Sequence, residues 1–568
     1  MKQLTLLFLL FILGFQTQAQ QRFWVFLEQP DHNSTAALLN PEQEGDAERL
    51  RSMAMLSNRA LERRERLNIP LRESDLSFKS YGRSFVERRL RERGYTVRGY
   101  SRWLRAYSVE VESKSELEDF ISEFRYFENG CGMEKARHLT IRPIHSMQVQ
   151  RVNQTLPLAN PMIPAAVPPR GNHWYNYGEA YSQTDMVNGH FLHDEGYDGR
   201  DMLIAVLDGS FFGADEYGGL ARIYDEGRIV AEYDFVNGDT NVYRGTGTHG
   251  SRVFSIMGAD VDGRMVGAAP KASYALLRTE DEQSETHIEE DNWIFAMEFA
   301  DSIGADVINT SLGYTTFDSG VDYTPADMDG RTAVVTYGAT MAHRAGMVVV
   351  SSAGNSGATS WRIISAPADA DSILAVGAVD SNEVVGLFSS RGPSADGRVK
   401  PDVMAQGVLT SHLGTFGVVT RGNGTSFSSP VIAGFAACFW QANPEASNYE
   451  IMEWIRQSSD RYGRPNSDYG YGIPDFRLAM ALSGATEADD ETLVYPNPTS
   501  GWVNIRMPDA GPISYSVATS TGHEVQSGEI SFPQNTSLRL SQTLTNGVYI
   551  LTLHSTSEPV VVRLVLNR

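Results

Sequence analysis

The sequence is poor in cysteine, in basic residues and in long apolar runs. Its two cysteines, Cys131 and Cys438, exclude a disulfide framework and a cysteine-built metal site. Basic residues number 48 against 70 acidic ones, and the net charge of −22 argues against a general binder of nucleic acid or anionic membranes. No run reaches the roughly 20 apolar residues of a membrane-spanning helix. With 41% hydrophobic residues in 568 positions, the composition indicates a globular protein of more than one domain.

The N-terminus carries an export signal. Lys2 precedes an apolar run from Leu4 to Phe15, and the small residues Thr17 and Ala19 follow. A charged start, a short apolar stretch and small residues before a cut are typical of a secretory signal peptide. We therefore predict a signal peptide over residues 1–19, and a mature protein that leaves the cytoplasm without a transmembrane segment.

Charge divides the chain into two parts. Residues 1–165 hold 24 basic and 20 acidic residues, which leaves 24 basic and 50 acidic residues for 166–568. A basic front part and an acidic remainder would attract each other, so electrostatics could help the one dock on the other. The alternative is that these are surface charges unrelated to docking. Because Cys131 and Cys438 lie in different parts, we expect no bridge between them.

Residues 20–150 mix strand-like and helical patterns. Strands are predicted at 23–27 and 107–111, and helices at about 47–67, 83–93 and 114–124. This order indicates a small α+β domain.

A proline-rich linker follows at 151–173, where we expect processing.

Residues 174–484 alternate short apolar runs with helical stretches. Near-continuous apolar strands separated by helices predict an α/β domain with a parallel sheet covered on both faces. Ligands of such sheets bind at the carboxyl ends of the strands. The predicted strands are 203–207, 229–235, 272–277, 306–308, 347–350 and 373–379, and the longest predicted helices are 287–303 and 331–345.

The C-terminal segment is different again. After an acidic linker at 485–492, residues 493–568 show strand alternation and turns but no helical pattern, which predicts a small β-sandwich.

Three residues on strand-following loops have the side chains of a charge-oriented base and a nucleophile. Asp208 ends the first apolar strand, His249 lies in a glycine-rich approach to a helical stretch at 251–257, and Ser426 comes just before an apolar helix at 431–440. Each alone is an ordinary turn residue, structural histidine or helix cap. Together, Asp, His and Ser can activate a hydroxyl.

A fourth residue supports this interpretation. Asn355 lies in a glycine-rich turn directly after the strand at 347–350, and glycines on either side let its amide point outward. The sequence thus predicts a rim that carries both a nucleophile and a hydrogen-bond donor.

These motifs resemble those of the subtilisin-like serine proteases, the subtilases. The resemblance covers 174–484, and the sequence departs from the family pattern in three places: Gly209 replaces Ser or Thr, Ser251 replaces Thr, and the pair Phe427-Ser428 replaces Met-Ala. None of the three changes removes a catalytic atom. The matching segments are 204–208, 249–254, 307–313, 353–355, 392–393, 400–403 and 424–430.

The resemblance implies a serine endopeptidase with Asp208, His249 and Ser426 as its triad and Asn355 as its oxyanion donor. It implies that Ser311, Leu312, Gly313, Ala353 and Gly354 bind protein or peptide substrates. No cofactor is required, structural calcium is possible without a nameable loop, and the histidine spacing suggests no metal site.

The two ends of the chain have resemblances of their own. Residues 20–150 resemble subtilase prodomains of the inhibitor-chaperone type, through 59–64 and 101–104, which makes the protein's own prodomain a partner. Residues 493–568 resemble the sorting domain of type IX secretion, through 494–501 and 547–551. This implies contact with that machinery, export through the periplasm of a Gram-negative bacterium, and a secreted or cell-surface location.

One alternative stays open: a secreted, non-catalytic binding protein or adhesin built on the same fold. A binding module needs none of Asp208, His249, Ser426 or Asn355, so their joint presence favours the enzyme.

Overall fold

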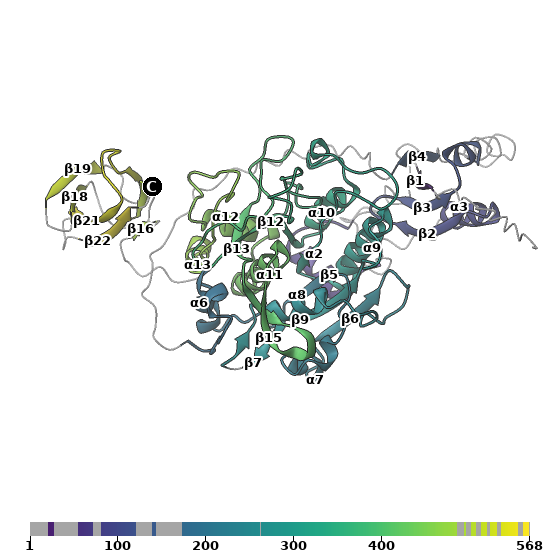
Figure 1. Cartoon of the computed structure of the whole chain (residues 1–568), viewed down its shortest axis with the longest axis horizontal. Coiled ribbons are helices and arrows are strands. Elements are labelled where there is room, and N and C mark those ends of the chain that lie inside the picture. The colour runs from purple at the N-terminus through teal and green to yellow at the C-terminus, as the bar shows by residue number, and fades with distance from the viewer. Residues whose placement is uncertain are drawn as a thin grey trace, which may run out of the picture. The chain divides into compact units, whose positions relative to one another are not determined.

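The computed structural model describes most of the chain between residues 21 and 566 (Figure 1). Contacts divide it into two compact units, residues 1–38 with 79–144 and residues 39–78 with 145–568. Our predictions for 1–19, 151–172, 485–492 and Cys131 fall outside the described residues. The described residues are 21–27, 55–71, 81–120, 139–143, 173–261, 263–484, 493–495, 501–506, 513–519, 523–530, 536–554 and 560–566.

The first unit is a four-stranded antiparallel sheet with the order β2-β3-β1-β4. Val25 and Val109 face a core that Leu90 of helix α3 and Leu117 complete. The predicted α+β pattern is confirmed, since residues 114–120 are also helical. The elements are β1 (Gln21–Leu27), α3 (Tyr81–Glu92), β2 (Thr96–Ser101), β3 (Ala106–Val111) and β4 (Leu139–Pro143).

The predicted helix at 47–67 needs a correction. Residues 55–57 are not helical, and α2 spans only Asn58–Arg66. Ser57 ends the non-helical stretch because its side chain accepts a hydrogen bond from the backbone N–H of Ala60, which caps the helix. By its contacts, this helix belongs to the second unit.

The second unit is built around a parallel sheet of seven strands with the order β13-β12-β11-β10-β5-β9-β6. All six predicted strands are present, and β13, which we had not predicted, adds an edge. The strands are β5 (Leu203–Asp208), β6 (Ile229–Asp234), β9 (Ser273–Arg278), β10 (Val307–Thr310), β11 (Val348–Ser352), β12 (Leu374–Val379) and β13 (Val403–Gln406).

Helices cover both faces of this sheet, as predicted. Alternate side chains of β10 point to opposite faces: Asn309 bonds to Ser429 of α11, while Thr310 accepts from Trp293 of α9. Helix α8 packs with α11, and α10 packs with α9. The helices are α8 (His249–Gly258), α9 (His287–Ile303), α10 (Val334–Arg344), α11 (Thr425–Ala442), α12 (Asn448–Gln457) and α13 (Phe476–Ser483), with short helices α5 (Tyr181–Asp185), α6 (Gly189–Asp194) and α7 (Ala221–Asp225).

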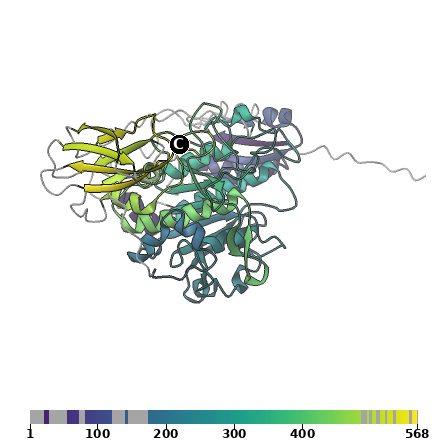
Figure 2. The ribbon, with the colours of Figure 1, turned by 60° about the vertical axis from the view of Figure 1, so that its left-hand side comes forward.

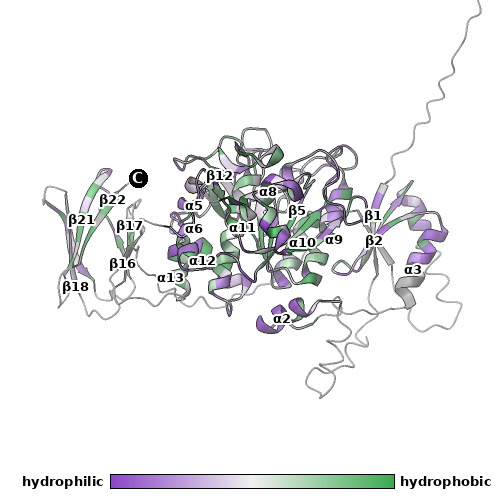
Figure 3. Cartoon of the chain, turned by 90° about the horizontal axis from the view of Figure 1, so that it is seen from below, coloured by the Kyte–Doolittle hydropathy of each residue, from purple (hydrophilic) through white to green (hydrophobic). Residues whose placement is uncertain are grey.

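Helix α11 is buried along nearly its whole length, because its residues are apolar on all sides. Figure 3 shows the hydrophobic strands of the sheet and the more hydrophilic outer helices. Cys438 lies inside this core and donates from Sγ to the carbonyl of Ala268 at 3.2 Å, in keeping with a packing role. Among the described residues, no helix is both long and apolar enough to cross a membrane.

The C-terminal segment forms two antiparallel sheets, the yellow strands of Figure 2. Val503 and Leu538 of one sheet share a core with Val517, Leu551 and Leu564 of the other, which makes the predicted β-sandwich. The strands are β16 (Leu493–Tyr495), β17 (Trp502–Arg506) and β20 (Thr536–Arg539) in one sheet, and β18 (Ile513–Thr519), β19 (Glu524–Ile530), β21 (Gly547–His554) and β22 (Val560–Leu566) in the other.

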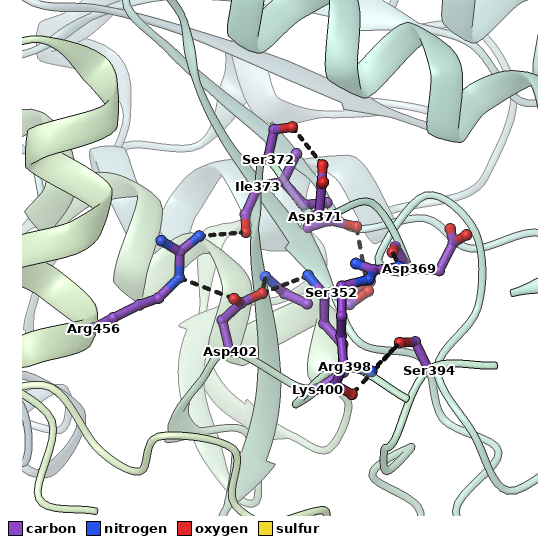
Figure 4. A network of polar contacts seen from close by, with 12 residues as sticks. Ser352, Asp369, Asp371, Ser372, Ile373, Ser394, Arg398, Lys400, Asp402 and Arg456 are labelled. Carbon is purple, nitrogen blue, oxygen red and sulfur yellow. Dashed lines mark hydrogen bonds and ion pairs between the residues drawn. The ribbon is translucent and has the colours of Figure 1, made fainter. Parts of the chain in front are cut away.

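A buried ion network lies where β12 and β13 begin (Figure 4). Asp402 accepts from Lys400 Nζ at 2.6 Å, from Arg456 Nε at 2.9 Å and from the backbone N–H of Ala375 at 2.9 Å. Burial disfavours its charged form, but Lys400 and Arg456 outweigh burial and hold the pKa of Asp402 below its ordinary value. The network therefore ties α12 to the sheet edge.

We expect Asp402→Asn to lower the free energy of unfolding by about 3–5 kcal/mol at neutral pH, because two buried cations lose their counter-charge. Since the pKa of Asp402 is depressed on folding, its contribution is complete above pH about 4 and is lost as the pH falls through the folded value. Denaturant unfolding at pH 7 and at about pH 3.5 measures both effects. Asp468→Asn, at an exposed carboxylate that pairs with the half-buried Arg391, is the control and should cost under about 1 kcal/mol. Equal losses in the two variants would contradict the role of the network.

Candidate active site

Asp208 and His249 meet at the carboxyl edge of the large sheet. Asp208 ends β5 and is fully buried, and His249 begins α8. Oδ1 of Asp208 lies 2.7 Å from His249 Nδ1. The same oxygen accepts a hydrogen bond of 2.8 Å from the backbone N–H of Gly209. The carboxylate thus fixes the imidazole while 41% of the histidine side chain stays exposed to an incoming molecule.

Ser426 lies in the first turn of α11, which begins at Thr425 and so starts earlier than the predicted helix at 431–440, and it is tied to Ser311, directly after β10. Its hydroxyl donates to the carbonyl of Ser311 at 3.2 Å, and the Ser311 hydroxyl donates to the carbonyl of Ser426 at 2.9 Å. Among the described residues no hydrogen bond joins Ser426 to His249. The structure therefore brings the Asp208–His249 pair and Ser426 to one rim, with the hydroxyl bonded to Ser311 instead of to the imidazole.

Asn355 is held at the same rim by the residue before Ser426. Its Oδ1 accepts from the backbone N–H of Thr425 at 2.9 Å and from the Thr425 hydroxyl at 3.0 Å. That hydroxyl also accepts from the backbone N–H of Gly354 at 3.2 Å. These bonds fix the side-chain carbonyl of Asn355, and the NH₂ group of the same amide remains as a donor.

The predicted substrate-binding residues follow β10 and β11. Leu312 accepts from the Ser352 hydroxyl at 3.2 Å, and Gly313 is exposed. Ala353 is buried, and its backbone bonds to Val376 and Ser365. Ala353 is thus buried beneath the rim, whereas Gly313 is exposed and Gly354 is half-buried.

We did not predict a role for Phe427 in the site, but its ring lies near two imidazoles. It stacks on His249 at 6.1 Å between ring centroids and packs on His412 at 4.9 Å. Burial lowers the pKa of His412 to about 4, so this second ring is neutral at neutral pH. Phe427 thus lies near both imidazoles at the rim.

Glu282 is a second residue that the motifs did not reveal. A Cβ at Gly247 would come 1.4 Å from Glu282 Oε1, and one at Gly209 would come 3.4 Å from it. Gly247 therefore leaves the space that this carboxylate occupies beside His249. No spacing rule could have found Glu282, because it comes from the loop after β9.

The pKa of His249 is raised above its ordinary value. Burial lowers it, but Asp208 outweighs burial through its charge and its hydrogen bond, and Glu282 adds to the effect. The second carboxylate oxygen of Asp208, Oδ2, is buried and has no hydrogen-bond partner among the described residues.

One group in the described residues could hold a metal ion, although the sequence showed no such spacing. Ligand atoms of His173, His190 and Asp194 all lie within 4.8 Å of one another. All three already have partners: His173 Nδ1 lies 2.9 Å from Asp194 Oδ2, and His190 Nε2 lies 3.1 Å from Asp185 Oδ1. The first contact ties His173, the last residue of the predicted linker, to α6, and the second joins α6 to α5.

The chain can be compared with known protein families. The Subtilase family model matches residues 183–473, which is about half of the chain. The chain belongs to the subtilase family. It is accordingly a serine endopeptidase with a subtilisin-like fold.

Individual relatives match the same part of the chain. Subtilisin DY of Bacillus licheniformis is 31% identical over 306 residues, which cover 53% of this chain and 97% of that protein. Subtilisin E of Bacillus subtilis is 30% identical over 291 residues, or 51% and 68%. Serine protease AprX of Bacillus subtilis is 28% identical over 298 residues, or 48% and 65%.

Two further family models match the ends of this subtilase. The Peptidase S8 propeptide domain of Bacteroidota matches residues 22–146, and the secretion system C-terminal sorting domain matches 493–567. The predicted propeptide and sorting domain are confirmed. The sorting domain supports a secreted or cell-surface location.

We expect the imidazole of His249 to titrate above pH 6.5 in protein carrying Ser426→Ala. Asp208→Asn should lower this pKa strongly and Glu282→Gln should lower it less, because each removes a negative charge that favours the imidazolium. NMR of histidine-labelled protein would measure the titration, with Glu226→Gln as a control at an exposed pair with Arg228. A pKa that Glu282→Gln leaves unchanged would contradict the electrostatic role of Glu282.

Proposed function

We propose that this subtilase is made as a zymogen that processes itself, and that it cuts peptide bonds with Asp208, His249 and Ser426. The observation that carries the proposal is the 2.7 Å bond between Asp208 and His249 at the rim where Ser426 begins α11. The linker at 151–173 is the expected region of self-processing.

The first chemical step needs one rotation. Ser426 turns its hydroxyl from the Ser311 carbonyl towards His249 Nε2, which takes the proton as Oγ attacks the substrate carbonyl. Asp208 holds Nδ1–H, so the lone pair of the imidazole lies on Nε2, and it stabilises the imidazolium that forms. His249 then gives the proton to the leaving amine, and a water molecule, activated in the same way, releases the acyl group from Ser426.

The oxyanion of the tetrahedral intermediate needs donors that are already in position. Asn355 offers its amide NH₂, which the bonds from Thr425 orient. The backbone N–H of Ser426 lies at the N-terminus of α11, whose dipole also favours negative charge.

The substrate backbone would pair with Ser311–Gly313 as an added strand.

Ser426→Ala should abolish casein hydrolysis, because it removes the attacking oxygen but no packing group. A fluorophosphonate should label Ser426 in the processed wild-type protein and fail to label the variant. Ser428→Ala, a buried serine that donates within the same helix, is the matched control and should keep activity. Unchanged hydrolysis by Ser426→Ala would exclude the triad, and no hydrolysis by any form would favour the binding protein or adhesin.

Asn355→Ala should reduce kcat about 100- to 1000-fold with little change in KM; this magnitude is borrowed from the loss of one oxyanion donor in subtilisin. Steady-state kinetics with a chromogenic peptide would measure it, with the exposed Asn382→Ala as a control. A change confined to KM would contradict a role in the transition state.

A further inference from the structure

One helix of the propeptide-matched region packs on the catalytic unit. Helix α2 lies within the matched residues 22–146, yet its contacts are with the C-terminal end of α9. The backbone N–H of Ser57 donates to the carbonyl of Ser302 at 2.7 Å. Figure 3 shows α2 to be largely hydrophilic. Ala60, Leu61, Arg63 and Arg64 of this helix are nevertheless buried.

The covered side of α2 contains two buried arginines. Arg63 and Arg64 are each 2% exposed, and both donate to the carboxylate of Asp301, which is fully buried in α9. Arg63 also donates to the carbonyl of Ala305. Burying a guanidinium is costly unless it is paired, so these contacts are specific to this position of the helix.

A second carboxylate binds the start of the helix. Arg59 donates to Asp306 and, at 3.0 Å, to the carbonyl of Gly304. Asp306 also accepts from the backbone N–H of Leu203, the first residue of β5, at 2.9 Å. Asp208 ends the same strand, five residues after Leu203. At a rise of ~3.3 Å per residue, the contact between Asp306 and α2 lies about 16 Å from Asp208.

Two glycines shape the surface beneath the helix. A Cβ at Gly304 would come 2.7 Å from the backbone nitrogen of Ala60, and one at Gly346 would come 2.8 Å from Leu67 and 2.7 Å from Ile69. Both glycines have positive φ, at +86° and +92°. We call the surface formed by Asp301, Gly304, Asp306 and Gly346 the amino-edge site.

We propose that the amino-edge site is a binding site for an arginine-bearing helix, and that its ligand is the segment 56–71 of this chain. The site is separate from the active site, so the segment can stay bound when the linker is cut. This inference does not rest on the proposed triad, because the site contains none of its residues.

Helix α2 depends on the amino-edge site for its stability. A nine-residue helix is marginal by itself in water, so α2 gains its stability from the surface on which it packs. Within the intact chain, the tether supplies a high effective concentration of the segment. Vacating the site leaves Asp301 and Asp306 without these arginine partners.

The test uses the full chain with Ser426→Ala, in which the site is emptied by Arg63→Glu and Arg64→Glu. We expect the melting temperature to fall by about 5–10 °C, and added synthetic peptide 56–71 at ~100 µM to recover at least half of the loss. The same peptide with Arg63→Gln and Arg64→Gln should recover none of it. Arg88→Glu with Arg91→Glu, two exposed arginines of α3, is the matched control and should shift the melting temperature by under about 2 °C.

Fluorescence anisotropy of labelled peptide gives an independent measurement. The wild-type peptide should bind the emptied chain at least ten times more tightly than the control chain, whose site is already filled. Equal binding to both chains, or binding to neither, would overturn the proposal. If the emptied chain does not fold alone, refolding with each peptide gives the answer: recovery with the wild-type peptide only supports the site, and recovery with neither or with both overturns it.

Discussion

The parallel pairing of β5 with β10 is the constraint on which the rest of the molecule depends. It places Val206 beside Asn309 and Leu207 beside Thr310, so Asp208 and Ser311 leave the sheet at the same edge. Because a parallel connection needs a crossover, α9 returns the chain to the opposite edge, where Asp301 and Asp306 lie. One register therefore fixes both the rim that carries Asp208 and Ser311 and the surface that receives α2.

Much of this arrangement could be predicted from the sequence. The sheet strands are short, continuous apolar runs, so their type and order could be predicted. The apolar helix that follows Ser426 could be predicted from its own apolar run. The seventh strand, Val403–Gln406, was not predicted, although it is as long as β10. The helix predicted at 47–67 was wrong at 55–57, where Ser57 bonds to the first turn of α2 and prevents a continuous helix.

What could not be predicted depends on residues distant in sequence. Glu282 and His412 carry no motif, and their relation to His249 follows from a loop and a hairpin that the chain brings to the rim. The partners of Arg63 and Arg64 were equally hidden, because periodicity identifies a face of α2 but not the carboxylate that neutralises it. Charged side chains of this kind are predicted to be exposed to solvent when their partners are not known.

Phe427 has a chemical consequence beyond its contacts. Where the family usually has methionine next to the nucleophile, this chain has a ring without sulfur. A thioether at that position would be open to conversion to the sulfoxide, which is polar and would disturb an apolar contact. A phenyl ring has no such step, so peroxide should leave the side chain next to Ser426 intact, an advantage for a protein whose sorting domain supports a location outside the reducing interior of the cell.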